Sequence, residues 1–414
     1  MSKVLIEQET ITSAENDFDS IQAAIISQGV KVPNGTSTSA YASKILQIEG
    51  GGTPGDGEIE SNDLDDPAVV YKKTRPNDWL TMPDVSENEI YLLFHLYPPT
   101  KNLIAFAVTC TDSYTIEYGI TTNKQFSVIG STTVSSGTIF EGAFLYEDWG
   151  NETSSSARQI MIKITGTDIT SFVQSTHSER NYASYKSWNI VDIKGNLPSC
   201  TSFFDGLQGG GVGVLQQLKY FSLEGTNSIT SGLNMFAGLI GLVTILHLDT
   251  SKMTNAQNLF RSCTSLMALP SDCDFSNATN ISYMFMTNTT ISRIPETWTF
   301  SKATNITSMF NGCSSLIYAT IDITSATAAS TILTSCYSLK SVKFKYTGTK
   351  TTFPTAISLQ YSSVSASAVE EFFNTLPTIS TSRSIDIRNT PAALTITDKQ
   401  KKIAEDKNWT VQIV

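Results

Sequence analysis

The chain repeats one ten-residue pattern of polar and apolar positions three times. The copies span residues 251–260, 276–285 and 301–310, and each ends on an apolar residue followed by Phe. Aligned on this position, the pattern extends over six sites, which are Phe204, Phe236, Phe260, Phe285, Phe310 and Leu333. From Phe236 onward the steps are 23 to 25 residues long. A fixed period of this size predicts a solenoid of stacked coils.

Each predicted coil carries two more apolar positions. The first lies six residues after the Phe and is occupied by Leu242, Leu266, Ile291, Leu316 and Leu339. The second lies nine residues after it and is occupied by Ile245, Leu269, Ile294, Ala319 and Val342. In the first coil, Leu218 and Phe221 take these places after an insertion that begins at Gln208. This spacing predicts a short strand in every coil, and stacking at ~4.8 Å aligns the apolar side chains in ladders.

A Thr-Asn pair recurs in the three best copies and places Asn255, Asn280 and Asn305 at equivalent positions. A repeated polar residue has two interpretations, a ladder that supports the fold or a site that binds a ligand. Asn side chains inside a solenoid can satisfy the backbone of a turn, so we favour the structural ladder. We expect function to depend on the segments that vary around the repeat, such as the glycine-rich insertion that begins at Gln208.

The N-terminal part of the chain differs from the repeats. Residues 1–52 predict a helical attachment module, with short amphipathic helices over Ala14–Ser27 and Tyr41–Ile48. Two such helices bury little area alone, so we expect them to dock on another chain or to trimerise. Residues 53–66 form a glycine-rich acidic linker.

Three larger segments follow the linker, and together they predict a multidomain, β-rich fold. Residues 67–180 predict an antiparallel β-sandwich, with strands over Ile90–Tyr97, Leu103–Cys110, Tyr114–Tyr118 and Gln159–Thr165. Residues 181–350 predict the solenoid of stacked coils. Residues 351–414 break its period and predict an α/β cap that covers its open end. Within the cap, Ser367 and Thr397 predict N-caps of two helices, and Asn408 predicts a left-handed stop.

The composition limits the kinds of molecule that the chain is expected to bind. The net charge is -10, and only 16% of residues are charged. Nucleic-acid binding needs clustered Lys and Arg, so we expect no nucleic-acid partner. No apolar run approaches the ~18–20 residues that span a bilayer, and the first residues lack the apolar core of a signal peptide. We therefore expect neither membrane insertion nor export by the ordinary route.

The chain offers little catalytic chemistry. His95, His177 and His247 are isolated from other metal-ligand residues, and no nucleotide-binding or nucleophile motif is present. We therefore predict no catalytic residue, no cofactor and no metal site. The six cysteines contain no CxxC pair, and Cys263, Cys313 and Cys336 follow the repeat position at a fixed distance, which predicts buried apolar slots. Glu147 and Asp148 predict a solvated turn. Three aromatic residues could stack on sugars or belong to the core, namely Trp149, Tyr346 and Tyr361.

The repeat resembles a known family. The pattern Asn-x-x-x-(Met/Leu)-Phe-x-x-Cys-x-x-Leu-x-x-(Leu/Ile) runs from Asn255 to Leu269, and from Asn305 to Ala319 with Ala in the last place. It resembles the BspA-like leucine-rich repeats of bacterial and protist surface proteins and of phage virion proteins. Leu239 and Asn288 replace the Cys, and Leu333 replaces the last Phe. The segment from Asn389 to Val411 looks like the end that follows such repeats.

Two further stretches resemble phage proteins. Residues 4–10 and 43–52 look like the N-terminal module of tail proteins from phages of Gram-positive hosts. Residues 75–83 with 114–119 are similar to a PKD-like β-sandwich of virion proteins, although Ile120 and Thr121 stand where that family has Asp-Gly.

These resemblances imply a structural phage virion protein that is not an enzyme, a tail or head fibre on the particle surface. They imply that residues 1–52 bind other virion proteins and that the repeats bind a host cell-surface protein or glycan. A homo-oligomer is expected, with a trimer favoured, and multivalency would strengthen weak contacts. The alternatives are a cell-surface adhesin of a bacterium or protist and a tail-borne glycan depolymerase.

Overall fold

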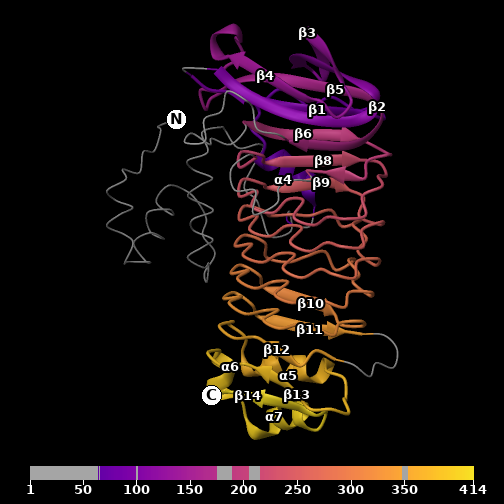
Figure 1. Cartoon of the computed structure of the whole chain (residues 1–414). Helices are drawn as coiled ribbons and strands as arrows, with labels where there is room; N and C mark the ends of the chain where they lie inside the picture. Colours follow the sequence, from indigo (N-terminus) through magenta and orange to yellow (C-terminus); the bar gives the residue numbers. More distant parts are fainter. Residues whose placement is uncertain (1–63, 65, 99–100, 175–188, 205–214, 347–352) are drawn as a thin grey trace, which may run out of the picture. The chain divides into compact units, whose positions relative to one another are not determined.

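A computed structural model describes residues 64, 66–98, 101–174, 189–204, 215–346 and 353–414 (Figure 1). The chain divides into a unit of Met1–Glu49 and a unit of Gly50–Val414, and all described residues belong to the second. The two predicted N-terminal helices, nearly all of the linker and the insertion after Gln208 lie outside the described residues. The predicted β-rich fold is confirmed.

A large mixed sheet occupies the N-terminal half of the described chain. Its strand order is β3-β2-β5-β1-β6-β8-β9; in addition, β4 pairs with β2, and the two-residue β7 (Ser202–Phe203) pairs with β5. The antiparallel strands are β1 (Glu89–Leu96), β2 (Lys101–Thr122), β3 (Gln125–Ser135), β4 (Ile139–Leu145) and β5 (Arg158–Gln174). The four predicted strands correspond to parts of β1, β2 and β5, with Tyr97 one residue beyond the end of β1, and β2 joins two of them. The short η2 (Tyr146–Asp148) exposes Glu147 and Asp148, as predicted.

Strand β6 (Ile190–Asn196) joins the antiparallel strands to the repeats. It pairs antiparallel with β1 on one side and parallel with β8 (Tyr220–Glu224) on the other. Strand β9 (Thr244–Leu248) then pairs parallel with β8. The sequence predicted a separate sandwich and a separate solenoid, but their strands belong to one hydrogen-bonded sheet. The predicted boundary at residue 180 lies outside the described residues.

Between residues 226 and 343, each turn of chain hydrogen-bonds to equivalent residues of the next turn. Parallel bridges join Asn255 to Asn280 and Asn280 to Asn305. The Phe260 N–H donates to the Met284 carbonyl at 2.9 Å, and this bond recurs along the chain. Strands β10 (Tyr318–Asp322) and β11 (Ser341–Lys345) pair parallel at the same repeat position as β8 and β9 (Figure 1). We call residues 226–343 the coils.

The hydrogen bonds of the coils recur beyond residue 350, although the regular spacing of 23 to 25 residues ends there, as predicted. The Leu359 N–H donates to the Asp386 carbonyl at 2.8 Å, and the Ile387 N–H to the Gln412 carbonyl at 3.0 Å. These are the bonds that Phe260 makes in the coils. Leu359 and Ile387 are fully buried, and the second residue after each has positive φ, as in the coils. The steps lengthen to 26 and 28 residues, which conceals the period.

Helices lengthen these later turns. They are α5 (Ala366–Thr375), α6 (Pro391–Thr395) and α7 (Asp398–Glu405), and the parallel strands between them are β12 (Ala356–Ser358), β13 (Arg383–Asp386) and β14 (Trp409–Gln412). Thr397 and Gln400 form the predicted capping box of α7, and Asn408 takes the predicted left-handed conformation with φ 65°. The N-cap of α5 is Ser365 rather than Ser367, because its side chain accepts the Ala368 N–H.

Helix α4 (Pro67–Thr74) was not predicted, since the β domain was expected to begin at residue 67. Asp66 caps it by accepting the Ala68 N–H, and Pro67 suits its first turn. Just after it, Arg75 Nε lies 2.9 Å from Asp192 Oδ2 on β6, and the Tyr71 hydroxyl donates to the same oxygen at 3.0 Å. Asp192 is 2% exposed, so this ion pair is buried. We call Tyr71, Arg75 and Asp192 the junction cluster.

No helix in the described part of the chain is long and apolar enough to cross a membrane.

Candidate functional site

The predicted repeat-core residues lie in one column, which begins at Phe204 and continues through the coils. Phe204, Phe236, Phe260, Phe285 and Phe310 are 0–1% exposed, and Leu266 and Leu316 are fully buried. Consecutive rings stack from Phe236 to Phe310, with centroids 5.4 to 5.6 Å apart. Phe204 meets Phe236 edge to face at 6.1 Å. This column holds the coils together and offers no surface to a ligand.

The three ladder asparagines support turns. The Oδ1 atoms of Asn255, Asn280 and Asn305 each accept the backbone N–H two residues later, at 3.1 Å. Such bonds close a local turn without help from the next coil. The side chains are half-buried rather than buried. Backbone bridges join this column from coil to coil, and the Asn280 Nδ2 also donates to the Gln257 Oε1 of the preceding coil at 3.1 Å.

The repeated cysteines also serve the backbone. Cys263, Cys313 and Cys336 donate their thiols to the carbonyl of the Phe one coil earlier, at 3.0 to 3.1 Å. Burial raises the pKa of the Cys336 thiol to about 12 and raises that of Cys313 well above its ordinary value. These thiols stay neutral, so they are poor nucleophiles and poor metal ligands.

Asn288 takes the place of Cys in the middle coil. It is fully buried, and neither its Oδ1 nor its Nδ2 has a hydrogen-bond partner among the described residues. An unsatisfied buried amide costs about 1–3 kcal/mol. Asn288 therefore destabilises its own coil relative to the coils that carry Cys at this position.

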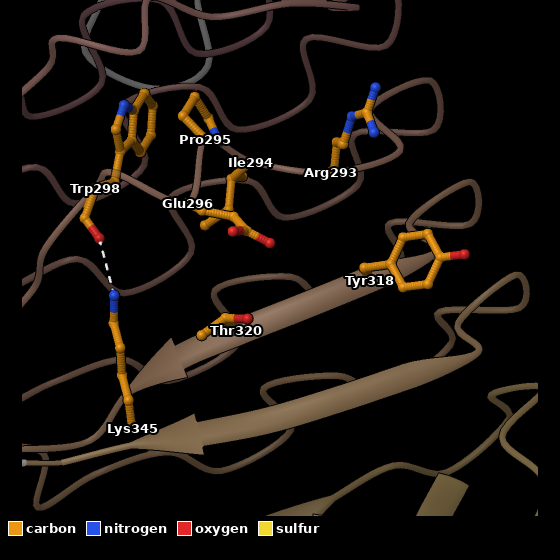
Figure 2. A pocket seen from close by; sticks show the side chains of 8 residues that line it. All are labelled: Arg293, Ile294, Pro295, Glu296, Trp298, Tyr318, Thr320 and Lys345. Carbon is orange, nitrogen blue, oxygen red and sulfur yellow. Dashed lines mark hydrogen bonds between the residues drawn. The ribbon is translucent and has the colours of Figure 1, made fainter. Parts of the chain in front are cut away.

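A small hollow opens over β10 on the strand side of the coils. Figure 2 shows its wall, the loop of residues 293–298, beside Tyr318 and Thr320 of β10 and Lys345 of β11. The hollow has a volume of ≈ 40 Å³, which is room for a few water molecules or one small substituent. A larger ligand would therefore lie mainly on the surface around it.

Polar and aromatic groups surround the hollow. The Lys345 Nζ donates to the Trp298 carbonyl at 3.4 Å, which holds the loop against β11. The Trp298 indole is buried, and its N–H donates to the Pro270 carbonyl at 2.9 Å. The Tyr318 ring is 55% exposed, and Glu296 is also exposed. An exposed ring beside charged and hydroxyl groups suits contact with a polar molecule that has an apolar face.

The sequence did not single out Arg293, Glu296, Tyr318 or Lys345. A signal was present, because Arg293 and Tyr318 each lie eight residues after the repeat Phe, just before the buried strand position. Alternation along a strand turns such neighbours outward. Of the aromatic residues that were singled out, Trp149 is 8% exposed and belongs to the core, whereas Tyr346 and Tyr361 are 40% and 47% exposed.

The histidines do not form a site among the described residues. His95 is 2% exposed against the Trp79 ring, and burial lowers its pKa to about 3. His247 Nε2 lies 3.1 Å from the Gly225 carbonyl, and His177 is outside the described residues. Across the described ranges, no group of three His, Cys, Asp or Glu side chains could hold a metal ion.

The described fold defines a β-rich repeat protein whose parallel coils extend a mixed sheet. Residues 226–343 match the family described as "Mycoplasma protein of unknown function, DUF285", and this stretch is the coils. No curated protein and no solved structure matches the chain.

Proposed function

We propose that this chain is a structural protein of a phage particle, a tail or head fibre, whose coils form a BspA-like leucine-rich-repeat solenoid that contacts the host surface. The observation that supports this is that constant and variable residues occupy different positions within the coils. The repeated Phe, Asn and Cys side chains are used inside the coils, while outward strand positions vary. Arg293, Tyr318 and Ser341 occupy one such position in successive coils. A constant frame with a variable surface suits recognition.

The proposed contact surface surrounds the hollow over β10. Tyr318 and Lys345 supply an exposed ring and a cation on neighbouring strands, and Glu296 supplies an anion. Because the hollow is small, each contact is weak and attachment depends on several copies acting together. The ligand of this surface is a protein or glycan of the host envelope.

The test uses the labelled full chain and intact cells of a panel of Gram-positive bacteria. We expect binding to particular strains, reduced at least tenfold by the double substitution Tyr318→Ala and Lys345→Ala. Tyr337→Ala is the matched control, because Tyr337 is 56% exposed but does not line the hollow. Equal binding by all three chains would contradict this use of the surface.

We propose further that residues 1–52 attach the chain to other virion proteins, that residues 351–414 cap the coils and that the assembled form is a homo-oligomer, with a trimer favoured. Strand β3 gives a physical reason to expect an oligomer. It is an edge strand of eleven residues without Lys, Arg, Asp, Glu or Pro, and it exposes 50% of Val128 and 62% of Ile129. Proteins usually protect such edges with charge, proline or a partner.

Two measurements separate this proposal from its rivals. Antibodies against the chain should label purified phage particles, and loss of residues 1–52 should abolish the label while the protein still folds. Label on bacterial or protist cells instead of particles would favour an adhesin. Release of reducing ends from host wall or capsular polysaccharide would favour a depolymerase.

A further inference from the structure

A second, wider groove lies on the sheet beside the turn between β2 and β3. It has a volume of ≈ 610 Å³, within the range of small-molecule sites. Its lining comes from five parts of the chain, and the residues are Pro83, Asp84, Tyr91, Glu117, Asn123, Lys124, Gln125, Phe126, Val128 and Lys163. Its residues, 83 to 163, precede the coils in the sequence, and none of them lines the hollow over β10.

The floor of the groove is a row of side chains from adjacent strands. Tyr91 of β1 pairs with Lys163 of β5, and Lys163 pairs with Glu117 of β2. Neighbours directly across strands project from the same face of a sheet. The Tyr91 ring meets the Phe126 ring edge to face at 5.8 Å. Phe126 is half-buried and Val128 is half exposed, so they form an apolar strip along one side.

The charges of the groove are balanced. Asp84 and Glu117 face Lys124 and Lys163 among the lining residues, so these four side chains sum to zero. Lys163 Nζ lies 2.8 Å from Glu89 Oε1, and Lys124 Nζ lies 3.1 Å from Asp84 Oδ1. Burial raises the pKa of the Tyr91 phenol, which keeps it neutral. An ionic ligand would have to compete with existing ion pairs.

From this lining we infer that the groove binds a neutral saccharide. A sugar ring has an apolar C–H face that can lie on Phe126 and Val128. Its hydroxyl groups can donate to the Glu117 and Asp84 carboxylates and exchange hydrogen bonds with the amides of Asn123 and Gln125. A purely apolar ligand would leave these polar groups unpaired, which costs free energy. The saccharide site is independent of the host contact proposed for the coils.

The experiment is calorimetric titration of the full chain with neutral oligosaccharides, using N-acetylhexosamine and hexose series as probes. We expect saturable binding to at least one series, weakened at least tenfold by Phe126→Ala and at least fivefold by Glu117→Gln. Ile139→Ala is the control, because Ile139 is 50% exposed on β4 and does not line the groove. It should bind as the unchanged chain does.

Two results would overturn the inference. One is equal affinity in Phe126→Ala, Glu117→Gln and the control. The other is tighter binding of a carboxylated oligosaccharide or inorganic phosphate than of any neutral sugar. Because Phe126 also contacts Tyr91, Gln125→Ala serves as a second variant whose exposed side chain leaves the fold intact, and it should weaken binding at least threefold. The coil substitution Tyr318→Ala should leave this affinity unchanged, which separates the two surfaces.

Discussion

The coils and the junction cluster both satisfy buried polar groups, but they do so with different kinds of contact. In the coils, successive turns reuse the same neutral contacts: the rings from Phe236 to Phe310 stack, and three thiols donate to the carbonyls of the preceding coil. At the junction, by contrast, a single buried ion pair and one phenol hold α4 against β6. The repeated neutral contacts spread the stabilisation over many residues. The ion pair instead concentrates it at one contact, and loss of either partner leaves the other as an unpaired buried charge, which is destabilising.

The largest expected effect comes from the Phe column. Phe285 is fully buried and stacks on Phe260 and Phe310, so Phe285→Ala should lower the free energy of unfolding by about 3–5 kcal/mol. Chemical denaturation of the full chain measures it. Phe285→Leu is the control and should cost about 1.5 kcal/mol or less, because Leu333 fills the same place in its own coil. A small loss in both variants would mean that the stacked column does not hold the coils.

The junction cluster should respond almost as strongly. Asp192→Asn leaves the Arg75 guanidinium buried without its counter-charge, so the free energy of unfolding should fall by about 3 kcal/mol. The double variant Arg75→Met with Asp192→Leu removes both charges and should recover most of that loss. If the double variant is as unstable as Asp192→Asn, the stability lost in Asp192→Asn does not come from an unpaired buried charge.

Acid should lower the free energy of unfolding of the chain through His95. Its folded pKa, about 3, lies below the ordinary value of 6.5, so the unfolded chain takes up the proton first as the pH falls. Stability is therefore lost as pH drops below about 6.5, by roughly 2 kcal/mol between pH 7 and pH 5. Denaturation at both pH values measures the loss. His95→Phe cannot titrate and should show a difference smaller by that amount; an unchanged difference would exclude His95 as the cause.

The smallest effect should be a gain. Asn288→Cys replaces an unsatisfied buried amide by the residue that donates to a carbonyl in three other coils, so stability should rise by about 1–2 kcal/mol. The melting temperature of the full chain reports it. Asn288→Ser supplies a hydroxyl without filling the volume and should gain less. A loss in both would show that Asn288 has partners beyond the described residues.

Most predictions that rest on a local signal were accurate, although the N-cap of α5 is Ser365 rather than the predicted Ser367. The Phe position, the Cys slots and the Thr397 capping box depend on spacing within one coil or one helix turn, and the structure has each of them. The turns at Leu359 and Ile387 were missed because helices lengthen the steps between them. Helix α4 was missed because its eight residues carry little apolar periodicity beyond Val70.

The sequence by itself determined the repeat, because apolar side chains must recur wherever identical turns stack on one another. It also determined which polar side chains recur to serve those turns. Only the tertiary structure decided that β6 joins the antiparallel strands to the repeats. Strands β1 and β8 are far apart in sequence, and they pair with opposite edges of β6, where each satisfies the backbone groups of that edge. The hollow over β10 and the groove beside β3 arise in the same way, from outward side chains that packing brings together after the core has formed.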